Sequence, residues 1–258
     1  MNQHRVLYKE FLGFMIKCNA LLFGDFTLKS GRMSPYFINT GEYKTGEQLS
    51  RLGDFYAKLI HNSVRRPDAA GSVDEVPDVA EMAAINEKIL ARHNVLFGPA
   101  YKGIPLVTAA SSKLYSYGLS LNVSFDRKER KDHGEGKQIM GYYPQDGDRI
   151  AIIEDVTTAG TSVRDTVALL RELNIDAEVT ALYISVDRME RGTGGASATA
   201  QLKQEYGIDV YSIATVADII DYLEDPPPDC APVPDAIKHA SSIRKYLDEY
   251  GCGAAASY

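Results

Sequence analysis

Five short apolar runs, which begin at residue 94, constrain the fold of this chain more than any other feature. They are "NVLFGP", "LSLNVSF", "RIAIIEDV", "VTALYISVD" and "VYSIA". Nearly unbroken apolar runs of this length are typical of strands that are buried on both faces. Several of these runs are separated by segments in which the apolar residues have helical spacing. One such segment is "SVRDTVALLRELN", where Val163, Val167 and Leu170 share a face. The alternation predicts an α/β protein with a mostly parallel central sheet flanked by helices.

The rest of the chain predicts further helices and a hairpin. Amphipathic helices are expected from about Val6 to Leu22, from about Glu47 to Ile60 and from about Asp235 to Tyr250. The last of these follows the proline-rich break "EDPPPDCAPVP". The segment "FGDFTLKSGRMSPYFINTG" combines aromatic and β-branched residues with turn residues, which predicts short strands or a hairpin.

A polar stretch and a helix are expected between residues 64 and 90. The stretch "VRRPDAAGSVDEVP", from Val64 to Pro77, contains two prolines and mixed charge, which predicts a surface loop. Asp78 then has the character of a helix N-cap, with Glu81 three residues later. The apolar residues of the expected helix share one face; they are Val79, Met82, Ile85 and Ile89.

Composition argues against several functional classes. The net charge of −7 and the pI of about 5.3 argue against a general binder of nucleic acid or of anionic membranes. No apolar run reaches the length that spans a membrane, and charged residues interrupt the N-terminal apolar stretch, unlike a signal peptide. The scattered cysteines show no metal-ligand spacing and predict reduced thiols in the cytoplasm; they are Cys18, Cys230 and Cys252.

The segment "RIAIIEDVTTAGTS" is the first candidate for a binding site. A buried strand that ends at Val156 and a helix that starts near Thr161 place it at the carboxyl edge of the sheet, where ligands bind. The free N–H groups of a helix N-terminus suit a phosphate, and Gly160 permits close approach of the backbone. Glu154 and Asp155 repel phosphate, so we expect them to face ribose hydroxyls or a hydrated cation.

Spacing alone leaves open whether this segment binds a ligand or is an ordinary strand–turn–helix connection. It is not a Walker A loop, because no Gly-Lys-Ser/Thr follows at the required spacing. It is not a dinucleotide fingerprint either, because that motif needs three glycines.

The same residues carry a resemblance to known proteins. "IIEDVTTAGTS" resembles the signature of type I phosphoribosyltransferases that binds 5-phosphoribosyl 1-diphosphate (PRPP), in which two acids approach the ribose hydroxyls and the loop cradles the 5-phosphate. Four more segments resemble those of the orotate phosphoribosyltransferase family in the family's order: "TLKSGRMSPYFINTG", "GPAYKGIPL", "RKERKDHGEG" and "SVDRMERG". The resemblance implies one phosphoribosyltransferase domain over residues 1–258, with an N-terminal hood at 1–45 and an insertion at 64–90.

The resemblance also implies roles for individual residues. Orotate would contact Lys29, Phe37, Arg188 and Thr158, with Tyr36 beside the base. PRPP would contact Glu154, Asp155, Thr157, Thr158, Ala159, Gly160, Thr161, Ser162, Tyr101 and Lys102. The catalytic group would comprise Asp155, Lys102, Lys128, Lys131, Arg127 and His133. We expect the Asp155 carboxylate to lie exposed at its strand end.

The implied activity is the Mg²⁺-dependent transfer of phosphoribose from PRPP to orotate, which gives orotidine 5'-phosphate and pyrophosphate in de novo pyrimidine (UMP) biosynthesis. Mg²⁺ would be held through PRPP and water rather than by direct protein ligands. A basic lid at residues 127–140 would act on the neighbouring subunit of a homodimer. Two alternatives remain, namely transfer to another base and a non-enzymatic regulator that keeps the fold, although the basic lid argues against the regulator.

Overall fold

A computed structural model of the chain describes residues 3–28, 31–65, 78–128, 138–157, 160–192, 195–228, 230 and 232–252. Its central sheet consists of β3 (Val95–Gly98), β4 (Asn122–Asp126), β5 (Ile139–Gly141), β6 (Arg149–Thr157), β7 (Glu178–Asp187) and β8 (Asp209–Thr215). The spatial order is β5-β4-β3-β6-β7-β8. All pairs are parallel except that of the edge strand β5 with β4.

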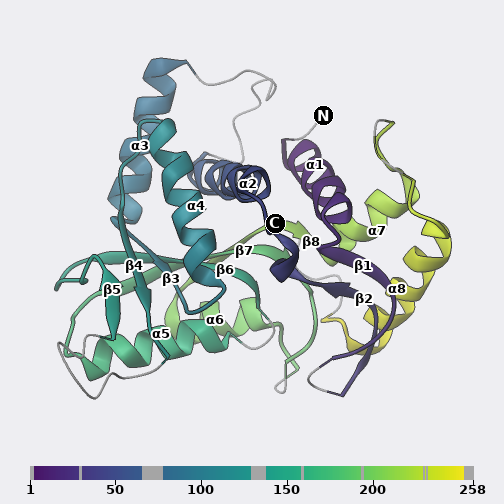
Figure 1. Cartoon of the computed structure of the whole chain (residues 1–258). Helices are drawn as coiled ribbons and strands as arrows, with labels where there is room; N and C mark the ends of the chain where they lie inside the picture. Colours follow the sequence, from purple (N-terminus) through teal and green to yellow (C-terminus); the bar gives the residue numbers. More distant parts are fainter. Residues whose placement is uncertain are drawn as a thin grey trace.

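Helices cover both faces of this sheet (Figure 1). α2 (Gly46–Val64) and α4 (Gly103–Ser116) lie on one face, and α3 (Val79–Arg92) packs against α2. α5 (Thr161–Glu172) and α6 (Ala198–Tyr206) lie on the other face. The alternation along β6 explains its unbroken apolar run, because Ala151 and Ile153 join one core cluster while Ile150 and Ile152 join the other.

A smaller unit stands beside the carboxyl ends of the strands. Its elements are α1 (Gln3–Lys17), β1 (Leu21–Thr27), β2 (Met33–Ile38), the short 3₁₀ helix η1 (Thr40–Glu42), α7 (Val216–Glu224) and α8 (Ala236–Tyr250). β1 and β2 form an antiparallel hairpin, and α8 packs against both β2 and α7 (Figure 1). We call this unit the hood. It therefore combines N-terminal elements, which lie within the expected hood region of residues 1–45, with two helices from the C-terminal part of the chain.

Most of the expected elements are confirmed. The five apolar runs form β3, β4, β6, β7 and β8, and the expected hairpin is β1–β2. Asp78 caps α3 by accepting a hydrogen bond from Glu81 N at 2.8 Å, but Val79 of the expected apolar face is 89% exposed. The N-terminal helix ends at Lys17 rather than near residue 22, because Asn19 adopts a positive φ of 57° and the chain enters β1.

Part of the expected insertion, residues 66–77, lies outside the described residues. No helix in the described part of the chain is long and apolar enough to span a membrane.

Candidate active site

The turn from β6 into α5 lies at the carboxyl edge of the sheet, as expected. Gly160 caps α5 with φ 65° and ψ 22°, a left-handed conformation that favours glycine. A Cβ atom there would lie 2.8 Å from Leu202 Cδ2 of α6, so the site also lacks room for a side chain. The N-terminus of α5 therefore lies at the sheet edge, and the amides of a helix N-terminus suit an anion.

Asp155 is buried, so the expectation of an exposed carboxylate is wrong. Its side chain is covered from the hood and from the turn that leads into α4. Oδ2 accepts hydrogen bonds from Thr40 Oγ1 at 2.7 Å and from Lys102 Nζ at 2.8 Å, and Oδ1 accepts one from Val156 N at 2.8 Å. The residue is only 6% exposed. Its oxygens are therefore fixed in direction, which preorganises the acid for a polar ligand.

Burial also affects the other acid of the pair, Glu154. Burial raises its pKa from the ordinary 4.5 to about 7; a hydrogen bond with Ser162 opposes this rise and the negative charge of Asp155 adds to it. The Tyr56 hydroxyl donates to the Glu154 carbonyl oxygen at 2.5 Å and anchors the strand end. The Glu154 carboxyl group therefore keeps its proton to a higher pH than an exposed glutamate does.

The turn between β3 and α4 brings cationic and aromatic groups to the same edge. Ala100 N donates to Asp126 Oδ1 at 2.5 Å, which ties this turn to the end of β4. Tyr101 is 62% exposed, and Lys128 Nζ lies 5.8 Å from the centre of its ring. The backbone of Arg127 donates to Gln138 O at 2.9 Å, so the two ends of the expected lid meet.

A pocket of about 270 Å³ lies between the hood and α4, beside Lys102. It is lined by Thr40, Gly41, Tyr43, Leu49, Leu52, Tyr101, Lys102, Pro105 and Leu106. Two of its lining residues, Thr40 and Lys102, also donate hydrogen bonds to Asp155. The buried Tyr43 hydroxyl has no hydrogen-bond partner within the described residues.

Arg188 follows directly after β7, whose Asp187 is in register with Thr157 of β6. Its guanidinium lies 4.5 Å from the centre of the Tyr36 ring of the hood and is only 5% exposed. Phe37 stacks on Phe26 of the neighbouring strand at 5.4 Å between ring centres. The structure therefore places Arg188 against the hood hairpin that carries Phe37, at the carboxyl end of β7.

Several expected site residues lie outside the described part of the chain. They are Lys29, Lys131, His133, Thr158 and Ala159, together with the side chain of Thr157. Thr161 is exposed at the first turn of α5, and Ser162 pairs with Glu154.

Sequence reasoning missed four residues that support the expected site residues. Thr40 and Tyr56 contact the acid pair, Glu190 contacts Arg188, and Tyr246 contacts Glu190. Thr40 and Glu190 belong to the quoted segments "INTG" and "SVDRMERG", so the sequence contained a signal for both. Tyr56 contacts Glu154 from 98 residues away and Tyr246 contacts Glu190 from 56 residues away. No local pattern predicts contacts at such separations.

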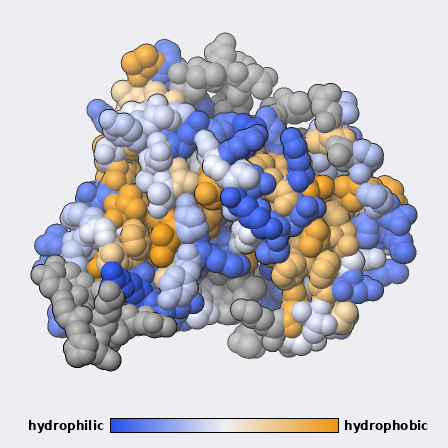
Figure 2. Space-filling model, viewed as in Figure 1, coloured by the Kyte–Doolittle hydropathy of each residue, from blue (hydrophilic) through white to orange (hydrophobic). Residues whose placement is uncertain are grey.

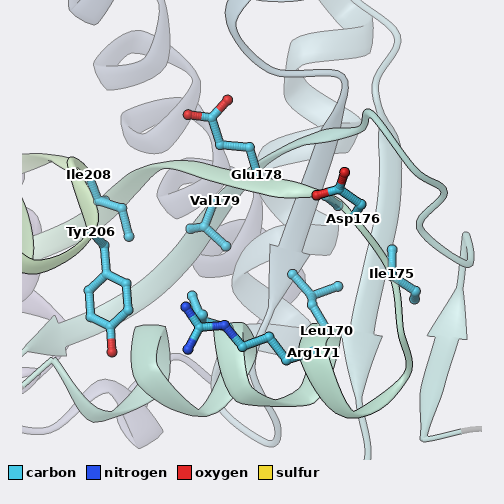
Figure 3. A pocket seen from close by; sticks show the side chains of 10 residues that line it. Leu170, Arg171, Ile175, Asp176, Glu178, Val179, Tyr206 and Ile208 are labelled. Carbon is cyan, nitrogen blue, oxygen red and sulfur yellow. The ribbon is translucent and has the colours of Figure 1, made fainter.

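A second pocket of about 270 Å³ lies at the opposite end of the strands (Figure 3). Its walls include Leu170 and Arg171 of α5, Val179 of β7 and Ile208. None of the expected site residues lines it. In α/β sheets ligands bind beyond the carboxyl ends of the strands, so we assign the site to the other edge.

The described residues contain no group of three or more His, Cys, Asp or Glu side chains that could hold a metal ion. A dedicated protein cage for a metal is therefore absent from this part of the chain. The pair Glu154 and Asp155 fits the other mode of Mg²⁺ binding, in which one or two carboxylates act together with water and substrate oxygens.

Comparison with known proteins gives a consistent result. No protein-family model matched the chain. The chain is 43% identical over 249 residues to an orotate phosphoribosyltransferase of Lachnoclostridium phytofermentans, covering 95% of this chain and 98% of the relative. It is 44% identical over 216 residues to that of Clostridium beijerinckii, covering 83% and 85%. The crystal structure of orotate phosphoribosyltransferase from Francisella tularensis matches with a TM-score of 0.70 and 32% identity, covering 94% and 99%.

Proposed function

This chain belongs to the orotate phosphoribosyltransferase family, and we propose that it transfers the phosphoribosyl group of PRPP to orotate. The products are orotidine 5'-phosphate and pyrophosphate, in de novo pyrimidine (UMP) biosynthesis. The observation that carries the proposal is the acid pair Glu154–Asp155, which lies between a helix N-terminus and Lys102. An anionic sugar needs this combination, because phosphate requires N–H donors while ribose hydroxyls require acceptors.

In the proposed complex the phosphoribose lies over the β6–α5 turn. The amides from Thr157 to Ser162 and the hydroxyl of Thr161 donate to the 5-phosphate. Asp155 and Glu154 accept hydrogen bonds from the ribose hydroxyls. Asp155 already has three donors, so the sugar must share its oxygens or displace Lys102.

Catalysis in this proposal is electrostatic. Departure of pyrophosphate spreads positive charge over C1 and the ring oxygen of the sugar, as in glycoside hydrolysis, and needs no protein nucleophile. Lys102, with a side chain that is 61% exposed, can turn from Asp155 towards the leaving group. Lys128, close to Tyr101 on the same edge, adds a second cation. Fixed charges that face developing charge usually contribute the largest catalytic term.

The remaining catalytic assignments come from the family resemblance. Arg127, Lys131 and His133 would reach the pyrophosphate from the lid. Tyr101 would border the same group.

We assign Mg²⁺ as the cofactor. Glu154 and Asp155 are the residues that would hold it, through water and the ribose oxygens. When bound, the cation neutralises charge on the leaving pyrophosphate. Burial raises the pKa of Glu154, so its carboxyl group would have to release a proton to pair with the metal complex.

Orotate would lie between the acid pair and the hood. Arg188 supplies a cation for its anionic ring substituents, and Phe37 borders the ring beside Tyr36. Lys29 and Thr158 complete the expected contacts.

An assay with several bases tests this assignment. The purified protein should release pyrophosphate from PRPP with orotate and not with uracil or adenine. Equal rates with an uncharged base would contradict the assignment of Arg188 to an anion.

We further propose a homodimer in which the lid of one subunit acts on the site of the other. Figure 2 shows hydrophobic side chains among hydrophilic ones on the face that carries α4. Tyr101 and Tyr115, near the two ends of this helix, are 62% and 73% exposed. Large exposed side chains of this kind favour a subunit contact.

Mixed dimers test the shared site. Lys131→Ala chains and Asp155→Asn chains should each be nearly inactive alone. When the two are unfolded and refolded together, half of the dimers are mixed and carry one intact site out of two. The mixture should therefore regain about a quarter of wild-type activity. Confirmed mixed dimers that stay inactive would show that the lid acts on the site of its own subunit.

We propose a cytoplasmic location, which the free thiols of Cys18, Cys230 and Cys252 support. We propose neither nucleic acid nor a membrane as a partner.

A further inference from the structure

The Arg188 guanidinium is held by an acid two residues further along the chain. Glu190 Oε1 accepts from Arg188 Nε at 2.7 Å and from Nη2 at 2.6 Å. The two side chains are 6% and 8% exposed, so water screens the contact little. Charge-assisted hydrogen bonds in such a dry place hold the plane of the guanidinium in one orientation.

The hood supports this pair from the other side. Tyr246 of α8 donates to Glu190 Oε1 at 2.9 Å. Its ring meets that of Tyr36 edge to face, with 6.3 Å between ring centres, and Tyr36 in turn lies against the guanidinium of Arg188. The C-terminal helix is therefore connected to Arg188 through both Glu190 and Tyr36.

These contacts leave one end of the guanidinium for a ligand. Arginine has five N–H donors, and Glu190 occupies those of Nε and part of Nη2. Ser34 Oγ accepts a longer hydrogen bond from Nη2 at 3.4 Å. The Tyr246 hydroxyl also interacts with the Arg188 side chain. The hydrogen bonds to Glu190 and Ser34 come from Nε and Nη2, so an anion that binds Arg188 would meet Nη1, in a direction that Glu190 sets.

We propose that Glu190 and Tyr246 are positioning residues, through which the C-terminal helix α8 sets the affinity for the orotate anion. This rests on the proposed function, because it takes Arg188 as a contact of orotate. Charge alone predicts the reverse effect for Glu190. A carboxylate beside the cation weakens the attraction for an anion, so its removal would tighten orotate binding if orientation did not matter.

Four variants separate the two effects. Glu190→Ala removes both charge and acceptor, Glu190→Gln keeps an acceptor oxygen, and Tyr246→Phe removes one hydrogen bond while it keeps the ring. For orotate we expect KM to rise about 10-fold in Glu190→Ala and about 3-fold in Tyr246→Phe, as for lost hydrogen bonds to charged groups. Glu190→Gln should restore part of the Ala loss. KM for PRPP should stay within about 2-fold of the wild type, and Arg188→Lys serves as the reference.

Helices α7 and α8 of the hood supply matched controls. Glu224→Gln weakens an exposed Arg–carboxylate pair, in which Arg244 Nη2 contacts both Glu224 oxygens at 2.7 and 2.8 Å. Tyr222→Phe removes a buried hydroxyl from α7. Both should leave KM for orotate unchanged, whereas a general loosening of the hood would raise it in the controls as well and overturn the proposal.

The outcomes for the proposed function and for the positioning role are distinct. A wild-type protein that does not consume orotate contradicts the proposed function. If Arg188→Lys leaves KM for orotate unchanged, Arg188 is not a base contact and the positioning role fails with it. If Arg188→Lys raises KM but Glu190→Ala and Tyr246→Phe leave it unchanged or lower it, the function stands and the positioning role is wrong. Tyr246→Phe alone decides the matter if Glu190→Ala does not fold.

Discussion

The raised pKa of Glu154 predicts that stability depends on pH and, if the proposed function holds, that PRPP binding does too. A pKa of about 7 in the folded protein, against an ordinary 4.5 in the unfolded chain, means that the folded state binds the proton more tightly. This contribution to stability is fully present below pH 4.5 and is lost as the pH rises through 7. The difference corresponds to about 3 kcal/mol.

The assay compares wild type with Glu154→Gln by urea unfolding at intervals from pH 4.5 to 8. Glutamine has no proton to lose, so the difference in free energy of unfolding between the two proteins isolates this one carboxyl group. Relative to the variant, the wild type should lose about 3 kcal/mol across the interval. Parallel stability curves for the two proteins would refute the assigned pKa and its origin in burial.

The same group should govern ligand binding in the opposite direction. In the proposed function a Mg²⁺–PRPP complex would pair with the ionised carboxylate, so it would have to displace the proton at low pH. Its Kd in wild type should rise about 10-fold from pH 8 to pH 6, beyond any change in Glu154→Gln, since pH 6 lies about one unit below the pKa. Titration calorimetry at both pH values measures this ratio and the proton released.

Three other substitutions or deletions probe the site and its supports. Asp155→Asn should lower turnover at least about 100-fold but cost only about 1–3 kcal/mol of stability. Some stability is lost because the asparagine side chain keeps one acceptor oxygen for the three donors that contact Asp155. Steady-state kinetics and urea unfolding compare the two losses. Gly160→Ala should destabilise the protein by more than about 1 kcal/mol and raise KM for PRPP. The reason is that φ at Gly160 is 65° and that Leu202 occupies the space of an added Cβ atom. A neutral effect in thermal unfolding would contradict this. Trimming within residues 66–77, which lie outside the described residues, should leave both Michaelis constants nearly unchanged, and a large rise in either would show that the stretch reaches the site.

The sheet could be predicted from the sequence because its strands are buried on both faces. The apolar runs of β3, β4, β6, β7 and β8 result directly from that burial. Helices α4 and α7 received no predicted bounds. α4 begins with Gly103 and contains Pro105 in its first turn, where proline is tolerated but resembles a loop signal. α7 starts directly after β8, and only the Thr215–Asp218 capping box marks the boundary.

The sequence predicted the position of the candidate site on the sheet but not its packing. The β6–α5 turn, Lys102 and Arg188 lie at the expected edge because their segments follow strands. The burial of Asp155 could not be foreseen, because Thr40 and Lys102 cover it from 115 and 53 residues away. The raised pKa of Glu154 could not be foreseen either, because it results mainly from the burial of Glu154 in the folded chain.

The central claim is that the acid pair at the β6–α5 turn serves a phosphoribosyl transfer to orotate. The most direct measurement follows orotate loss and pyrophosphate release together, with purified protein, PRPP and Mg²⁺. We predict equal amounts of the two, both dependent on PRPP, and neither in an Asp155→Asn variant that still unfolds cooperatively. Pyrophosphate release without loss of orotate, or undiminished transfer in Asp155→Asn, would contradict the account.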